Sequence, residues 1–333
     1  MNGKEHLNNL PDVIMPSDYH RDSKLVSLSI PIFGSKKGRN ALFDSNSNFS
    51  VDKFKKQVCL SAVWAATSIA TNTDLCENGM PIYFHVEDVV EDIAVPILTK
   101  SGVPEDWIKQ TSFEEYPNYE KIKEVPYGKK CAVFTDDTIT TDVCIIWDSD
   151  AYVFRYGEEP ILNWYRLFEN DLADKPMFSF YSDWNGVESM FVNWLLRGVG
   201  MIEQEFNENS PTRELDMKMY ESMVYASVGF NLPNQQHRWG AAIFSCPRKH
   251  PLFEFIAKHH TKSYGDEALV TTYMNANPDT EYLHISESML DFILEDDVFI
   301  DRKSSCIAHL IGRPDKYLKF NQKFLKGIDG RKI

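Results

Sequence analysis

The amino-terminal third of the chain alternates between short apolar runs and segments in which apolar residues recur at helical spacing. Lys24–Phe33 (KLVSLSIPIF) is an apolar run that stops before Gly34, which is typical of a buried strand. The next segment carries apolar residues on one helical face: Phe54, Val58, Ala62, Ala65 and Ile69. We therefore expect a strand followed by an amphipathic helix.

The same order of strand and helix follows again. Pro81–Val86 (PIYFHV) reads as a second strand and Trp107–Phe113 as a third. Between them lies a second helical face, which should end at Gly102 and which consists of Val90, Ile93, Ala94, Ile97 and Leu98. This alternation predicts an α/β fold with a mostly parallel central sheet, flanked by helices and joined by right-handed crossovers.

Neither a repeat nor a low-complexity linker divides the chain. Residues 1–22 form a polar lead-in segment, and we expect a single α/β domain over residues 23–333. Within it, a helical elaboration is expected around residues 186–230. Because ligands bind beyond the carboxyl ends of parallel strands, site residues should come directly after strands.

The composition is compatible with a large core and excludes some functions. The chain has 333 residues, of which 43% are hydrophobic, and its formal net charge is −14. This charge argues against a protein that coats nucleic acid or anionic membranes. The longest apolar run, Val58–Thr71, is shorter than a membrane span needs, and the six cysteines form no CxxC pair. We expect a soluble protein of the cytoplasm.

One acidic motif lies where such a fold would bind a ligand. Val143–Trp147 is an apolar run typical of a buried central strand, and Asp148-Ser149-Asp150 follows it. Two carboxylates two residues apart can ligate one hard cation, Mg²⁺ or Mn²⁺, which also binds a nucleotide diphosphate. The chain contains no second Asp-x-Asp sequence. A solvated loop after a strand is the alternative interpretation.

The segment VCIIWDSDAYVF, residues 143–154, resembles the metal-binding region of GT-A glycosyltransferases. Three later segments follow in the order that this resemblance implies, and they are most similar to the retaining glycogenin and galactosyltransferase-like group: Trp239–Cys246 (WGAAIFSC), Gly265–Val270 (GDEALV) and His309–Lys316 (HLIGRPDK). The resemblance spans roughly residues 24–318. It implies a GT-A-like, Rossmann-like fold with the acceptor side mainly in residues 177–333.

The resemblance also implies a set of metal ligands. His309 would complete a site for Mn²⁺ or Mg²⁺ together with Asp148 and Asp150, and a neutral imidazole suits such an ion. A histidine that only packs in the core is the alternative interpretation of His309. Gly312 would permit close approach of a phosphate to the backbone.

The phosphate contact is ambiguous. Lys316 is similar to the phosphate-binding lysine of the family, but it lies one position later than the family pattern expects. Tyr317 follows it where Pro-Trp is usual. Arg313 is therefore a competing phosphate ligand.

Further carboxylates are candidates for roles beside the donor. Asp266 and Glu267 precede a helical run and resemble the acidic segment beside the donor sugar, where one would act as a catalytic group. A helix-capping role is the alternative for both. Asp88, after the second strand, could accept hydrogen bonds from the base or ribose; Glu87 is an equal candidate, and an N-cap is the alternative for Asp88.

These residues predict a metal-dependent glycosyltransferase that moves a hexose or pentose from a nucleotide-diphosphate donor, expected to be UDP-linked, to a hydroxyl acceptor. The His309 segment favours retention of anomeric configuration. The alternatives are a haloacid-dehalogenase-type phosphatase, a sugar-1-phosphate nucleotidyltransferase, and a catalytically silent nucleotide-sugar-binding subunit. The phosphatase pattern has Thr or Val where this chain has Tyr152, and the nucleotidyltransferase needs a Gly-rich phosphate loop that residues 34–39 imitate poorly.

Overall fold

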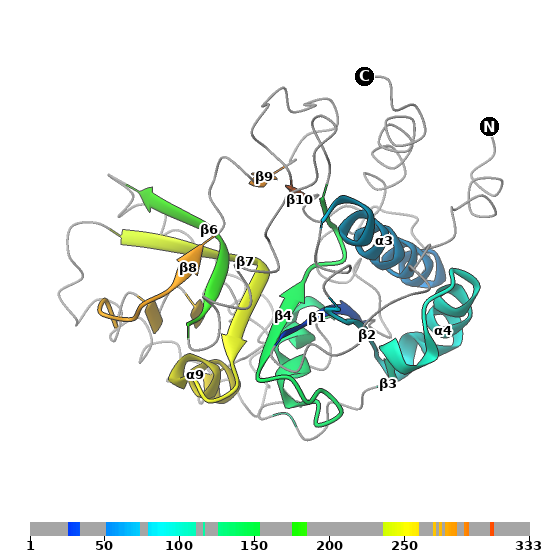
Figure 1. The fold of residues 1–333 in the computed structure, drawn as a ribbon, viewed down its shortest axis with the longest axis horizontal. Coiled ribbons are helices and arrows are strands. Elements are labelled where there is room, and N and C mark those ends of the chain that lie inside the picture. Colours follow the sequence, from blue (N-terminus) through cyan, green and yellow to red (C-terminus); the bar gives the residue numbers. More distant parts are fainter. Residues whose placement is uncertain are drawn as a thin grey trace, which may run out of the picture.

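The computed structural model describes residues 26–33, 51–73, 79–110, 116, 126–153, 175–184, 236–259, 269–270, 273–274, 277–284, 290–292 and 307–309. Within these ranges a seven-stranded sheet has the order β3-β2-β1-β4-β7-β6-β8 (Figure 1). Its strands are β1 (Val26–Ile32), β2 (Ile82–Val86), β3 (Ile108–Gln110), β4 (Val143–Trp147), β6 (Met177–Trp184), β7 (Gln236–Pro247) and β8 (Leu283–His284).

The sheet is mixed but mostly parallel, as expected. Strands β3, β2, β1 and β4 run parallel to one another, and β6 runs parallel to β8. Strand β7 is antiparallel to both of its neighbours, β4 and β6. The α/β fold class is therefore confirmed, and the carboxyl ends of β2, β1 and β4 meet at one edge.

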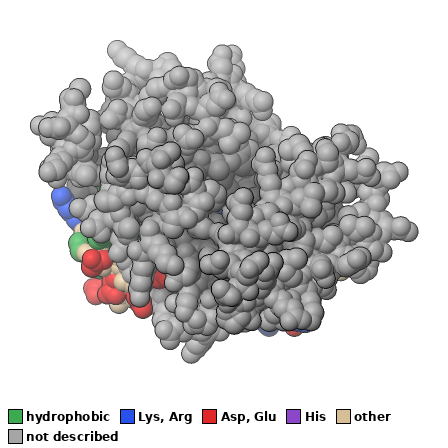
Figure 2. All heavy atoms as spheres, turned by 180° about the vertical axis from the view of Figure 1, so that it is seen from behind, with side chains coloured by type: hydrophobic (Ala, Val, Ile, Leu, Met, Phe, Trp, Pro, Cys, Tyr) green, Lys and Arg blue, Asp and Glu red, His purple; other side chains and the backbone are tan. Residues whose placement is uncertain are grey.

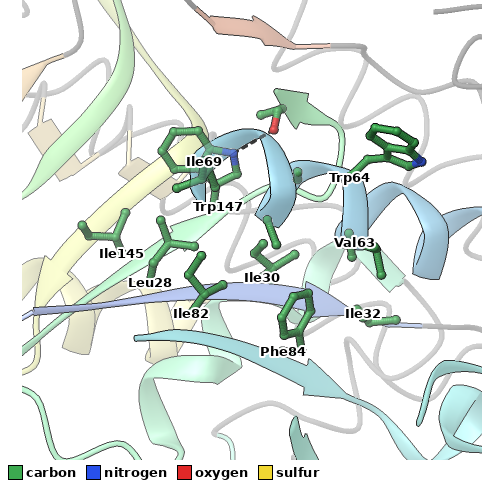
Figure 3. Packing of buried hydrophobic residues seen from close by; sticks show 14 of the residues in the cluster. Leu28, Ile30, Ile32, Val63, Trp64, Ile69, Ile82, Phe84, Ile145 and Trp147 are labelled. Atoms are coloured by element: carbon green, nitrogen blue, oxygen red, sulfur yellow. Dashed lines mark hydrogen bonds between the residues drawn. The ribbon is translucent and has the colours of Figure 1, made fainter. Parts of the chain in front are cut away.

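Helices α3 (Val51–Asn72) and α4 (Glu91–Lys100) pack with one face of this sheet in a single core. Figure 3 shows side chains of α3 against those of β1, β2 and β4. The predicted helical spacing is confirmed, since Ala62, Ala65 and Ile69 are all fully buried. Gly102 has a φ of 77° just after α4, a backbone angle that a side chain would disfavour.

The opposite face of the sheet is covered by the 3-10 helix η3 (Pro126–Thr135) and by α9 (Pro251–His259). Strand β4 contributes to both cores. Its residues Val143, Ile145 and Trp147 pack on the side of α3, while Cys144 and Ile146 pack on the side of η3 and α9. All five are buried, which explains why β4 reads as a continuous apolar run.

A smaller sheet continues from the motif. Strand β5 (Ala151–Val153) pairs antiparallel with β10 (Ile307–His309), which pairs parallel with β9 (Leu290–Phe292). Segments far apart in sequence therefore meet directly beside the Asp148–Asp150 turn.

Some boundaries differ from the sequence-based expectation. Within the predicted strand Trp107–Phe113, the structure describes a strand at Ile108–Gln110, which is β3. Trp107 instead belongs to the short 3-10 helix η2 (Glu105–Trp107) and is buried. The expected helical elaboration at residues 186–230 lies outside the described residues. No helix in the described part of the chain is long and apolar enough to cross a membrane.

A buried hydrogen-bond network joins the loop after η3 to the sheet. The Cys144 thiol donates to Ser29 Oγ at 3.1 Å, and Ser29 Oγ lies 2.9 Å from His85 Nε2. His85 Nδ1 lies 3.3 Å from Asp136 Oδ2, and a carboxylate can only accept, so this contact favours the ring proton on Nδ1. His85 Nε2 then accepts the hydroxyl proton of Ser29.

Burial keeps His85 neutral, and the network keeps Asp136 ionised. Burial lowers the pKa of His85 below its ordinary value. Burial alone would raise the pKa of Asp136, but hydrogen bonds from His85 and Thr138 hold that pKa well below its usual range. Because both pKa values are lower in the folded state than in the unfolded state, the folded protein binds these protons less readily. Low pH therefore favours unfolding.

We predict that the free energy of unfolding falls as pH decreases below about 6.5, and falls again below about 4. His85 contributes to the first decline because the unfolded histidine takes up a proton that the folded one resists. His85→Gln should therefore show a shallower decline between pH 7 and 5 than the wild type. Urea unfolding across this range measures it, with Ser27→Ala, which removes a buried hydroxyl and no titratable group, as the control. Equal pH slopes in wild type and His85→Gln would contradict the assignment.

Candidate metal and nucleotide site

Asp148 and Asp150 lie in a tight turn at the carboxyl end of β4. The Ala151 amide donates to the Asp148 carbonyl at 3.0 Å, and Trp147 Nε1 donates to the Ala151 carbonyl at 2.9 Å (Figure 3). Trp147 is fully buried, so its indole holds the end of the turn against the core. The two aspartates are only part-buried, as residues that bind a ligand at the edge of a sheet should be.

Lys130 of η3 contacts Asp148, and the sequence analysis did not identify it. Its Nζ donates to both carboxylate oxygens, at 3.1 and 3.2 Å. The lysine side chain is 10% exposed and the aspartate side chain 21%, so the pair is poorly hydrated. The only signal in the sequence was a pair of lysines, Lys129 and Lys130, before the apolar residues Cys131–Phe134, and this pattern does not reveal the partner of Lys130.

Helix α3 holds the turn from the core side. Ser61 Oγ donates to the Ser149 carbonyl at 2.6 Å, and Tyr152 Oη lies 2.6 Å from the same Ser61 oxygen. Two helical turns later, Ser68 Oγ accepts the Val153 amide proton at 3.0 Å. The turn and strand β5 are thus both anchored to one helix.

His309 lies in strand β10, in register with Ala151 of β5. Directly opposed residues in an antiparallel pair have Cα atoms about 4.5–5.5 Å apart. The backbone of His309 is therefore next to the residue that follows Asp150. The orientation of the His309 side chain is outside the described structure.

The second strand ends with Glu87 and Asp88 at the same edge. Glu87 is buried, and its amide donates to the Ile32 carbonyl at 3.2 Å. Asp88 is exposed and is the first residue of the 3-10 helix η1 (Asp88–Val90). The N-cap residue of η1 is therefore Glu87, whose side chain makes no capping hydrogen bond. The capping interpretation of Asp88 is therefore wrong.

Figure 2 shows acidic side chains gathered at one side of the molecule seen from behind. Near the carboxyl end of β2, the exposed acidic residues are Asp88 of η1 and Glu91 and Asp92 at the start of α4. Carboxylates here would repel phosphate but accept hydrogen bonds from hydroxyl or amide groups.

The other predicted site residues are not described by the structure: Asp266, Glu267, Gly312, Arg313 and Lys316. Among the described side chains, which do not include that of His309, no three His, Cys, Asp or Glu residues gather as a metal site. The structure thus brings Asp148, Lys130 and the backbone of His309 to one edge, and it leaves the remaining assignments as predictions.

No family model and no curated protein matches the chain. The apo crystal structure of mouse xyloside xylosyltransferase 1 is similar at 11% identity and a TM-score of 0.43, covering 86% of this chain and 98% of that one. The galactosyltransferase LgtC, solved with donor and acceptor sugar analogs, is similar at 10% identity and a TM-score of 0.41, covering 91% and 95%. Both similarities are too weak to carry a functional conclusion.

We predict that divalent cations stabilise the folded state of Lys130→Met more than that of the wild type. The substitution leaves the Asp148 carboxylate without its ammonium partner, which costs about 1–3 kcal/mol of unfolding free energy. A cation that binds Asp148 stabilises the folded state by mass action. Millimolar Mn²⁺ should therefore raise the unfolding temperature of Lys130→Met more than that of the wild type.

The control is Lys175→Met, which removes an ion pair with Glu281, whose side chain is 78% exposed. An exposed pair contributes little, so this variant should respond to Mn²⁺ as the wild type does. If Mn²⁺ raises the unfolding temperature of none of the three proteins in scanning calorimetry, Asp148 binds no divalent ion.

Proposed function

We propose that this protein is a metal-dependent glycosyltransferase that uses a nucleotide-diphosphate sugar, expected to be UDP-linked, and transfers the sugar to a hydroxyl acceptor. The observation that supports it most is the position of Asp148 and Asp150 at the carboxyl end of a strand buried on both faces, with His309 in the strand paired beside them. Both aspartates and the histidine are ligand types that Mn²⁺ and Mg²⁺ accept.

The residues at this edge fit a divalent ion even with Lys130 present. A carboxylate has about four lone-pair sites. Lys130 Nζ lies almost equally far from both oxygens of Asp148, on one side of that group. A carboxylate with an ammonium partner can still ligate a cation, and the ammonium limits the excess negative charge when no cation is bound.

A bound Mn²⁺ or Mg²⁺ would supply Lewis-acid stabilisation of the leaving diphosphate. The chain's own residues would do the rest. Asp148, Asp150 and His309 would hold the ion, while Lys130 orients the Asp148 carboxylate. Gly312 and either Arg313 or Lys316 would contact phosphate. Asp266 or Glu267 would act beside the anomeric carbon, as the resemblance to retaining enzymes implies.

The base and ribose would lie toward β2. Strands β2 and β4 flank β1, so their ends are about 10 Å apart at the usual strand spacing. Such a separation suits a nucleoside whose ribose and base face Asp88 or Glu87 while its diphosphate faces the Asp148–Asp150 turn. The acidic character of the surface around Asp88 favours the neutral, donor-rich part of the nucleotide over its phosphates.

We predict slow, metal-dependent release of nucleotide diphosphate from one donor in a panel of UDP-, GDP- and CDP-sugars. Asp150→Asn should lower this rate by about 100-fold or more with Mn²⁺ present, because a charged metal ligand is replaced by a neutral one. The control is Asp142→Asn, an exposed aspartate at the opposite end of the same strand.

Coupled detection of free nucleotide diphosphate, with Mn²⁺ and with EDTA, measures the rate. Turnover that persists in EDTA would reject metal dependence. Metal-dependent nucleotide binding without turnover on any donor would favour the silent binding subunit. Release of inorganic phosphate in place of nucleotide would favour the phosphatase.

A further inference from the structure

A chain of two hydroxyl groups connects the core to the turn that bears the two aspartates. Ser61 donates its proton to the Ser149 carbonyl, at 2.6 Å. The Ser61 oxygen can then only accept from Tyr152, whose Oη is 2.6 Å away, so the order is Tyr152 to Ser61 to Ser149.

Ser149 is the residue between the two aspartates, so the orientation of its peptide group affects both neighbours. The flanking peptides Asp148–Ser149 and Ser149–Asp150 share the backbone angles of Ser149, and the carbonyl of the second one is held by Ser61. Ser61 is 1% exposed and Tyr152 is fully buried, so water does not replace either hydroxyl. The orientation of the Ser149 carbonyl is therefore constrained by buried side chains.

The same contacts extend to the third predicted metal ligand. Tyr152 lies in β5, in register with Ala308 of β10, and the neighbouring residue Ala151 is in register with His309. Fixing Tyr152 against α3 therefore also fixes the strand on which β10 pairs. Neither hydroxyl serves as a ligand in the proposed metal site.

We propose that Ser61 and Tyr152 are positioning residues that set the affinity of the Asp148-Ser149-Asp150 turn for a divalent cation. This rests on the proposed metal-dependent function. Groups that orient metal ligands typically change metal affinity by 10–100-fold when they are removed. Ser61→Ala removes the hydrogen bond to the Ser149 carbonyl and the contact with the Tyr152 hydroxyl.

Direct Mn²⁺ binding tests this, measured by the loss of the free-ion electron paramagnetic resonance signal on titration into the full chain. Ser61→Ala should bind Mn²⁺ about 10-fold or more weakly than the wild type. Tyr152→Phe, which keeps the ring and the Ser61–Ser149 bond, should lose less.

Ser27→Ala is the matched control. Ser27 is also a fully buried serine, and its hydroxyl is 2.7 Å from the Thr141 hydroxyl at the other end of the sheet. The two serine variants should lose similar stability in urea, while the Ser27→Ala affinity for Mn²⁺ stays within about twofold of the wild type. If Ser61→Ala fails to fold, the comparison of Tyr152→Phe with the wild type decides.

The outcomes separate the two proposals. If Asp150→Asn abolishes Mn²⁺ binding but Ser61→Ala and Tyr152→Phe bind as Ser27→Ala does, the positioning role is overturned and the metal site stands. If the wild type itself binds no Mn²⁺, the metal-dependent function and the positioning role are both overturned.

Discussion

Burial of β4 on both faces is the constraint on which the rest of the structure depends. Three of its side chains pack into the core below α3, and the other two into the core below η3 and α9. A charged residue cannot stand within such a strand without a large desolvation cost. The acidic pair must therefore come where the strand ends, and there Trp147 and Ser61 hold the turn through bonds to its backbone.

The two helical layers contribute different groups to this turn. Helix α3 supplies uncharged hydroxyls that satisfy buried backbone groups, at Ser149 and Val153. The η3 layer supplies a charge, Lys130, to the carboxylate of Asp148. The loop after η3 is itself fixed to the sheet through Asp136 and His85. The polar groups near the site are thus held from both sides of the sheet, which favours a preorganised site.

Much of the fold could be predicted because local periodicity is strong in its first half. The spacing of Ala62, Ala65 and Ile69 marked α3, and the apolar run Val143–Trp147 marked a central strand with Asp148 at its end. Boundaries were less accurate, as at β3, where Trp107 packs in the core from a 3-10 helix. Apolar character identifies burial but does not distinguish short helical turns from strands.

The sequence by itself determined the elements of the parallel sheet and the position of the acidic pair, since both follow from side-chain patterns within a few residues. Only the tertiary structure decided which groups surround that pair. Ser61 meets Ser149 across 88 residues of chain, and Lys130 meets Asp148 across 18. Strand β10 adds His309 to the edge of β5 from much farther away. Such contacts depend on how the layers pack. A local pattern of residues does not predict which distant polar groups will come into contact.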